Sequence, residues 1–177
     1  MNVTADQLKQ ISPLIPADSA VTDLNAILTA AQCTSVQRAA MLIGQLAIES
    51  DYFRTRSEDP TSYAGKPYVP FYGRCWIQLT WKYNYHACGV AIGVDLETDP
   101  DAALQHNVDV CNWYWTSKRL NRFADDNDCD GCTRAINGQH ATDASLQLRE
   151  KYYKRALAAL QGSDPDFSDV VGGSSSV

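Results

Sequence analysis

Apolar residues recur every three or four positions over long stretches of the chain, which is the spacing of one face of an α-helix. Capping residues such as Thr4, and prolines or glycines beside these stretches, mark where the helices begin and end. We find no strand-rich region and expect no more than a short hairpin between Ser57 and Ile77. The pattern therefore predicts a mainly α-helical protein, with helices over residues 4–12, 18–32, 35–50, 80–92, 99–115 and 142–160.

The helix over residues 35–50 has the widest apolar stripe, and Glu49 lies at the edge of that stripe, three residues after Leu46. A carboxyl group at the C-terminal end of a helix meets the negative end of the helix dipole, and partial burial removes water from it. Both effects are expected to raise the pKa of Glu49, as a general acid requires. A solvated glutamate at a helix end is the alternative interpretation.

An irregular segment rich in proline and aromatic residues follows over residues 51–71 and contains Glu58. The next stretch, FYGRCWIQLTWKYNY, is dense in rings and amides, and Thr80 within it is expected to cap the helix that ends at Gly93. Paired carboxylates beside stacking rings and amide groups are what hydrolysis of a polysaccharide needs. This region therefore predicts a glycoside hydrolase site.

The composition is that of an ordinary globular domain, since 45% of the 177 residues are apolar and 20% are charged. We expect residues 1–161 to form one catalytic domain and residues 162–177 to form a loose tail. The net charge of −6 argues against nucleic acid or an anionic membrane as the main partner. No apolar run approaches the roughly 20 residues that span a bilayer. A monomer is expected.

The six cysteines admit two interpretations. An even number can form disulfides, but the N-terminal residues lack the basic start and apolar run of a secretory signal, so we favour buried free thiols. The CxxC at Cys129 and Cys132 has no second pair for zinc. The acidic turn ADDNDCDG has Asn137 where a calcium loop needs glutamate. No metal or cofactor is therefore expected.

Four motifs, AIESDYF, FYGRCWIQLTWKYNY, TRAING and LREKYYKR, together resemble glycoside hydrolase family 19, which comprises chitinases and lysozyme-like endolysins of bacteriophages. The resemblance extends from the N-terminus to Tyr153. It implies a two-lobed, lysozyme-like helical fold with a substrate cleft between the lobes. It also implies hydrolysis with inversion, by one general acid and one general base.

Carried over by position, the resemblance assigns roles to individual residues. Glu49 aligns with the general acid, Glu58 with the general base, and Thr80 with a hydroxyl that helps the base to orient water. Arg149 aligns with an arginine that pairs with acidic groups near the base, and we expect it to keep Glu58 ionised. The other expected substrate contacts are rings and amides at Tyr72, Gln78, Tyr83, Asn84 and Asn137.

The chain departs from the family pattern at several positions. Cys75 replaces the usual glycine of GRG, Gln139 replaces a second glycine after ING, and Ile48 replaces a histidine that is usual in plant chitinases. The segment between the two glutamates is short, as in compact bacterial and phage members. Trp76 and Trp81 are consistent either with stacking on sugar rings or with packing.

The leading hypothesis is an endolysin that cleaves the β-1,4 glycan of peptidoglycan and stays in the host cytoplasm until it is released to the cell wall. The alternative is a chitinase, which suits the acidic charge slightly better. Two further possibilities are a silent polysaccharide-binding or inhibitory module and a bacterial antagonism toxin of the same fold. The presence of Glu49, Glu58 and Thr80 argues against the silent module.

Overall fold

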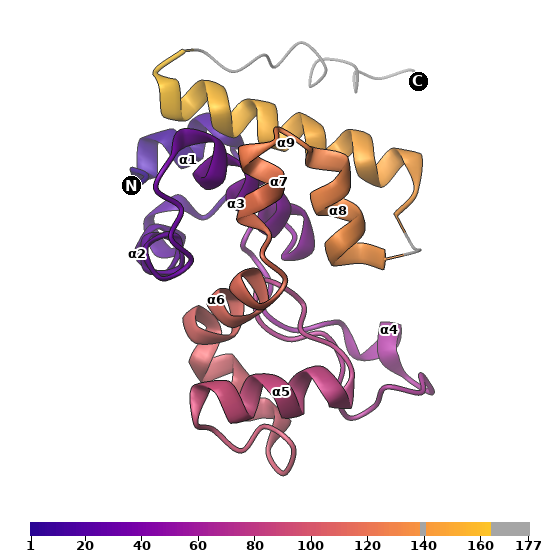
Figure 1. Ribbon diagram of the computed structural model, residues 1–177. Coiled ribbons are helices and arrows are strands. Elements are labelled where there is room, and N and C mark those ends of the chain that lie inside the picture. The colour runs from indigo at the N-terminus through magenta and orange to yellow at the C-terminus, as the bar shows by residue number, and fades with distance from the viewer. Residues whose placement is uncertain (139–140, 164–177) are drawn as a thin grey trace.

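The computed structural model describes residues 1–138 and 141–163, and these residues form helices joined by turns and loops (Figure 1). The tail was expected over residues 162–177, of which residues 164–177 lie outside the described residues. In chain order the elements are α1 (Ala5–Ile11), α2 (Ala17–Ala30), α3 (Val36–Glu49), α4 (Pro60–Tyr63), α5 (Lys82–Ile92), the 3-10 helix η1 (Pro100–His106), α6 (Asn107–Ser117), α7 (Asn121–Asp125), α8 (Cys129–Asn137) and α9 (Asp143–Gln161).

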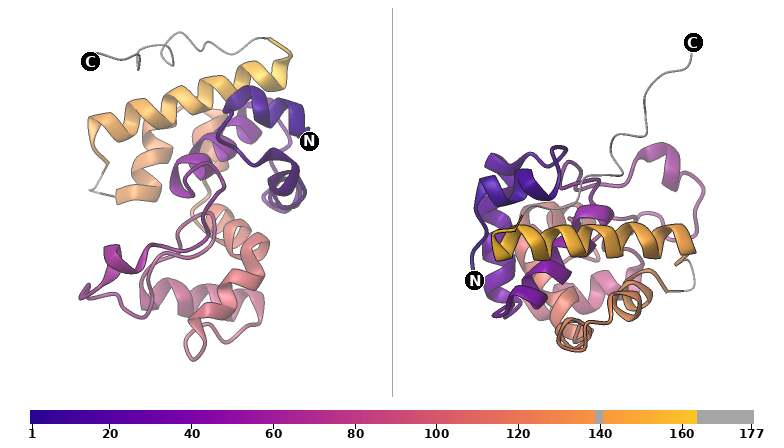
Figure 2. Two further views of the ribbon diagram at one scale, coloured as in Figure 1. Left: turned by 180° about the vertical axis from the view of Figure 1, so that it is seen from behind. Right: turned by 90° about the horizontal axis from the view of Figure 1, so that it is seen from above.

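The elements form two lobes, as Figures 1 and 2 show from different sides. The larger lobe contains α1, α2, α3, α7, α8 and α9, and the smaller lobe contains α4, α5 and the loops beside them, with α6 next to the junction. The prediction of a mainly α-helical, two-lobed architecture is confirmed.

Helix α3 is the centre of the larger lobe, and most of its residues are buried. The long helix α9 lies across it. The two backbones come very close at Gly44, where a Cβ atom would lie 2.8 Å from the backbone nitrogen of Tyr153. The missing side chain at Gly44 therefore sets how closely α9 approaches α3.

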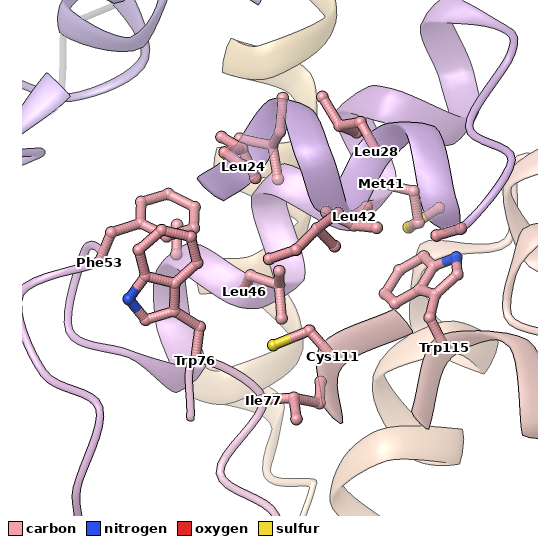
Figure 3. Close-up of a cluster of buried hydrophobic side chains, with 14 of the residues drawn as sticks. Leu24, Leu28, Met41, Leu42, Leu46, Phe53, Trp76, Ile77, Cys111 and Trp115 are labelled. Carbon is pink, nitrogen blue, oxygen red and sulfur yellow. The ribbon is translucent and has the colours of Figure 1, made fainter. Parts of the chain in front are cut away.

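One hydrophobic core joins the two lobes (Figure 3). Trp76 and Ile77, from the loop that leads to α5, lie near Leu46 of α3, and Cys111 of α6 lies beside them. All four side chains are buried. Burial of apolar surface is the main force that holds packed elements together, so this core connects the lobes.

Several helix ends follow the predicted capping chemistry. Thr4 and Gln7 form the capping box that begins α1, and the side chain of Ser35 accepts a hydrogen bond from the backbone of Arg38 at the start of α3. Gly93 adopts the left-handed conformation that ends α5, as predicted.

Three local predictions are wrong. The helix expected over residues 99–115 is divided into η1 and α6. The stretch expected to be a solvated acidic turn, residues 124–131, is an exposed turn only over residues 126–128, because its two ends belong to α7 and α8. Asp128 caps α8 by accepting a 2.8 Å hydrogen bond from the backbone N–H of Gly131. Thr80 does not cap α5, since Trp81 precedes the first helical residue and the Thr80 hydroxyl donates to the carbonyl of Gln78 instead.

Arg74 anchors the smaller lobe from within. Its buried guanidinium donates to Asp101 Oδ1 at 2.6 Å, to the Tyr85 hydroxyl at 2.8 Å and to the carbonyl of Pro70 at 3.0 Å. A buried cation needs such partners to offset its lost hydration.

The expected hairpin is reduced to two isolated bridges, in which Arg74 pairs with Ser57 and with Leu79. The backbone N–H of Glu58 continues this pairing by donating to the carbonyl of Gly73 at 2.8 Å. The loop that carries Glu58 is therefore tied to the segment that leads into α5.

All six cysteines are free and buried, as the favoured interpretation predicted. Burial raises the pKa of each thiol; for Cys88 and Cys111, for example, it raises the pKa to about 12. Among residues 1–138 and 141–163, no helix combines the length and the apolar character that crossing a membrane requires.

Gly44→Ala is expected to lower the free energy of unfolding by about 1–3 kcal/mol, because the added methyl group meets the backbone of α9. This loss should exceed the roughly 1 kcal/mol that alanine gains over glycine inside a helix. Urea denaturation followed by circular dichroism measures the change. Ala26→Ser on the exposed face of α2 is the control, and a Gly44→Ala protein as stable as wild type would contradict the close approach of the helices.

Candidate active site

A cleft of about 820 Å³ lies between the lobes and takes its walls from both. Seven of the nine residues predicted to form the site line it, whereas Tyr72 and Arg149 do not. The lining residues are Glu49, Glu58, Tyr68, Gly73, Ile77, Gln78, Thr80, Trp81, Tyr83, Asn84, Tyr114, Lys118, Ala135, Ile136, Asn137 and Gly138.

Glu49 is the last residue of α3, and an ion pair with α9 fixes its side chain. Nη2 of Arg149 donates to Glu49 Oε1 at 2.6 Å, and Nη1 of the same guanidinium donates to Gln45 Oε1 at 2.8 Å. The Arg149 side chain is 4% exposed and that of Glu49 is 14% exposed. Oε2 of Glu49 has no hydrogen-bond partner in the described part of the chain, so it is the oxygen available to a bound molecule.

Opposing influences act on the Glu49 carboxyl group. The Arg149 guanidinium attracts negative charge, whereas the C-terminal end of α3 and the low exposure of the site oppose it. Entry of a ligand that removes the remaining water would strengthen every one of these interactions. The Glu49 carboxyl group therefore lies between a cation and the C-terminal end of a helix.

The chain reverses direction directly after Glu49 through three successive left-handed residues, Asp51, Tyr52 and Phe53, with φ of 48°, 59° and 62°. For residues with a side chain, this conformation costs about 1–2 kcal/mol each. Ser50 supports the turn, because its hydroxyl donates to the carbonyl of Leu46 and accepts from the backbone of Phe53. Strain of this kind is concentrated at functional sites.

Glu58 is held by two neutral donors, one on each oxygen. The Tyr68 hydroxyl donates to Oε1 at 2.9 Å, and the backbone N–H of Gly73 donates to Oε2 at 3.0 Å. Hydrogen bonds to a carboxylate favour its charged form. Tyr68 was not predicted as a site residue, since nothing in its sequence spacing links it to Glu58.

The structure corrects the expected position of Arg149. This arginine was expected to lie beside Glu58 and keep it ionised, but its guanidinium contacts Glu49 and Gln45 instead. No ion pair joins Glu58 to a cation among the described residues. Alignment by position could not distinguish the two glutamates, because α9 is far from both in the sequence.

The segment between Gly73 and Asn84 folds into a tight turn that presents polar groups to the cleft. Gln78 adopts a left-handed conformation with φ of 54°, and its side-chain amide donates to the carbonyl of Cys75. Cys75 is also left-handed with φ of 63°, which explains why glycine is usual at this position. A Cβ atom at Gly73 would lie 2.5 Å from Gln78 Oε1, so a larger residue there would require the Gln78 side chain to shift.

Thr80 and Asn84 line the same wall of the cleft. The Thr80 hydroxyl uses its hydrogen to reach the carbonyl of Gln78 at 2.8 Å, which leaves its oxygen lone pairs free to accept from water. The Asn84 amide donates to the carbonyl of Thr80 at 2.8 Å, which leaves its own oxygen as an acceptor.

Three aromatic side chains form one rim of the cleft. Trp81 is 42% exposed and Tyr83 is 67% exposed, and their rings stack at a centroid distance of 6.5 Å. The Tyr68 ring meets Trp81 edge to face at 5.3 Å. Exposed rings of this kind are platforms on which sugar rings can stack.

Tyr72 and Trp76 do not have the positions that stacking on a sugar requires. The Tyr72 ring stacks on Tyr63 at 4.0 Å and lies 3.6 Å from the Arg74 guanidinium carbon, so both of its faces are covered. Trp76 is buried against Phe53 and is a packing residue. Sequence spacing places both rings beside the site but cannot show which way they point.

The cleft is also lined by Asn137, at the end of α8, and by Lys118, an exposed cation just after α6. Lys118 was not predicted, because a lysine near a helix end is usually a solvated residue. Gln139 lies outside the described residues. No cluster of three or more histidine, cysteine or acidic side chains that could hold a metal occurs within residues 1–138 and 141–163.

Comparison with known proteins gives a consistent set of relatives. Residues 41–143, more than half of the chain, match the model of glycoside hydrolase family 19, described as class I chitinases. Over 129 residues the chain is 34% identical to an endochitinase of Arabidopsis thaliana, which covers 64% of this chain and 44% of that protein. The chain spans less than half the length of this endochitinase and of two other curated chitinases that it matches.

Two solved structures share the fold over nearly the whole chain. Chitinase C from Streptomyces griseus superimposes with a TM-score of 0.73 at 22% identity, covering 93% of this chain and 78% of that one. A bacterial family 19 chitinase superimposes with a TM-score of 0.71 at 26% identity, covering 92% and 96%. These likenesses confirm the lysozyme-like helical fold.

Arg149→Met should lower the free energy of unfolding by about 3 kcal/mol, because it leaves the Glu49 carboxylate largely buried without its cation. Adding Glu49→Gln should recover more than half of that loss, since the double variant has no uncompensated charge. Chemical denaturation of the four proteins in this cycle measures the coupling. Equal stability of Arg149→Met and wild type would show that the ion pair contributes nothing.

Proposed function

The chain belongs to glycoside hydrolase family 19, the family of class I chitinases, and from this premise we propose that it hydrolyses the β-1,4 bonds of N-acetylglucosamine polymers. The observation that carries the proposal is that Glu49 and Glu58 line one cleft while having different surroundings. Glu49 projects from the larger lobe and Glu58 from the smaller one, so a glycan between the lobes would lie between two carboxyl groups.

Glu49 is proposed as the proton donor. Its Oε1 is occupied by Arg149, so the transferred proton would be held on Oε2. The ion pair fixes the direction of Oε2, while the helix end and the exclusion of water by a bound glycan favour the neutral acid.

Glu58 is proposed as the base that activates water. A base must be ionised, and the hydrogen bonds from Tyr68 and Gly73 favour that state without a neighbouring cation. Thr80 lines the same cleft, and its free lone pairs would hold the attacking water against Glu58. Inversion requires the two carboxyl groups to lie roughly 6.5–9.5 Å apart, with this water between them and the sugar.

The amides and rings of the cleft are proposed to bind the polymer. The free side-chain oxygens of Gln78 and Asn84 are acceptors for N-acetyl N–H and hydroxyl groups, and Asn137 lines the same cleft. Tyr83 and Trp81 supply exposed rings at the rim. Neutral hydrogen bonding and stacking suit an uncharged polysaccharide.

Peptidoglycan, the substrate that the sequence analysis placed first, is the second candidate. The relatives described above are named chitinases, which supports the neutral polymer. Lys118 is the observation that favours a wall glycan: it lines the cleft, and no ion pair joins it to a carboxylate within the described residues. Its ammonium group is available to the lactyl carboxylate of N-acetylmuramate.

Glu49→Gln is expected to reduce kcat on chitin hexamers by about 10²–10⁴-fold, because the amide cannot donate the proton. The fold should persist, since the amide oxygen can still accept from Arg149.

Glu58→Ala should lose most activity, and azide should not restore it. Glu150→Gln on the surface of α9 is the matched control. Release of reducing ends gives the rates, and NMR of wild-type products should show the inverted anomer first. Turnover by Glu49→Gln at the wild-type rate would remove Glu49 from the acid role.

Lys118→Gln separates the two substrates. If the cleft binds peptidoglycan, the variant loses an exposed ion pair worth about 0.5–1 kcal/mol. The turnover of peptidoglycan should then fall roughly two- to fivefold, while the turnover of chitin hexamers should not change. Mass spectrometry of digests of purified peptidoglycan and of chitin measures both. Wild-type products from chitin alone would exclude the peptidoglycan candidate.

A further inference from the structure

The side chain of Glu58 depends on one other side chain for its orientation. We propose that Tyr68 is a positioning residue for Glu58, with its hydroxyl fixing Oε1 and its ring fixed in turn by Trp81. The inference rests on the proposed role of Glu58 as the base. It adds a residue that the sequence analysis did not include and gives Trp81 a role besides contact with sugar.

Glu58 needs such a partner because it lies in an irregular loop rather than on a helix. Its backbone is tied to Gly73, whose N–H also holds Oε2. A single hydrogen bond would leave the carboxylate free to rotate about its side-chain bonds, at a cost in the geometry that general base catalysis requires. The second donor, on the other oxygen, fixes the plane of the carboxylate.

Tyr68 can act as a fixed donor because its ring is packed. Trp81 meets the ring edge to face at 5.3 Å, with an angle of 73° between the planes. Trp81 itself has a left-handed backbone with φ of 78°. The backbone N–H of Trp81 donates to the carbonyl of Phe71 at 2.9 Å, and the backbone carbonyl of Trp81 accepts from the backbone N–H of Asn84 at 3.0 Å. Strain in a residue so firmly held is a sign of a constrained site.

The chemistry of the phenol suits a donor that does not take part in proton transfer. Burial and the neighbouring Glu58 carboxylate raise the pKa of Tyr68, so the hydroxyl keeps its hydrogen throughout the neutral range. A neutral hydroxyl stabilises the carboxylate by hydrogen bonding and adds no positive charge. Glu58 can therefore accept a proton from water without being held as strongly as it would be by an arginine.

The aromatic contact also connects the base to the substrate. Trp81 and Tyr68 both line the cleft. A sugar ring that covers Trp81 would remove water from the Tyr68–Glu58 hydrogen bond, which strengthens an interaction of this kind. The base would then be held most firmly when the cleft is occupied.

Tyr68→Phe tests the inference on chitin hexamers. We expect kcat to fall about tenfold, a loss of about 1.4 kcal/mol in transition-state stabilisation, with KM changed less than twofold. The acid limb of the kcat/KM profile should move to higher pH, because a donor that favours the carboxylate is lost. Tyr63→Phe, at the end of α4, makes the same chemical change away from Glu58 and should leave both the rate and the pH profile as in wild type.

Two further variants keep the outcomes distinct. Adding Tyr68→Phe to Glu58→Gln should cause no further loss of kcat if Tyr68 acts only through Glu58. Trp81→Leu should lower kcat less in the Tyr68→Phe background than in wild type, because Trp81 acts on Glu58 through Tyr68. A change in KM alone, or an unmoved acid limb, would overturn the inference and make Tyr68 a sugar contact. If Glu58→Gln is fully active, the proposed base is wrong; if it is inactive while Tyr68→Phe is normal, only the role of Tyr68 fails.

Discussion

The ion pair between Glu49 and Arg149 connects the two helices on which the larger lobe is built. Its donor is nearly inaccessible to water, and both side chains lie where α3 and α9 pack together. The pair can form only because the helices come close, and they come close because position 44 carries no side chain. A feature of backbone packing thus determines the direction in which a carboxyl group faces the cleft.

The smaller lobe positions its own carboxylate by different means. Glu58 is fixed by hydrogen bonds from a phenol and a backbone amide, and the loop beneath it is tied to the buried Arg74. One carboxylate therefore has a cationic partner and a helix end, while the other has neutral donors. Two acids of the same chemical type acquire different environments in this way, which is the condition for opposite roles in one reaction.

The sequence was most informative where structure depends on local chemistry. The periodic stripe of α3, the capping box at Thr4 and the left-handed Gly93 follow from neighbouring residues, and all three are found in the structure. The helices α7 and α8 were missed because their turn is rich in acidic residues that also suit a solvated loop. Asp128 resolves this in favour of a helix by capping it.

The site was less predictable because the direction of a side chain depends on distant partners. The positions of seven lining residues followed from the motifs, but Tyr72 is covered by Tyr63 and Arg74, and Arg149 contacts Glu49 instead of Glu58.

The three left-handed residues after Glu49 have a consequence for how this protein could change. Glycine at any of them would relieve the folded chain but would enlarge the unfolded ensemble, so the net gain in stability would be small. The same replacement would loosen the bend that ends α3 beside the acid. Selection for a more stable fold and selection for a fixed direction of the Glu49 side chain therefore act in opposite directions at Asp51, Tyr52 and Phe53. Side chains that are poorly suited to this backbone conformation can persist there for that reason.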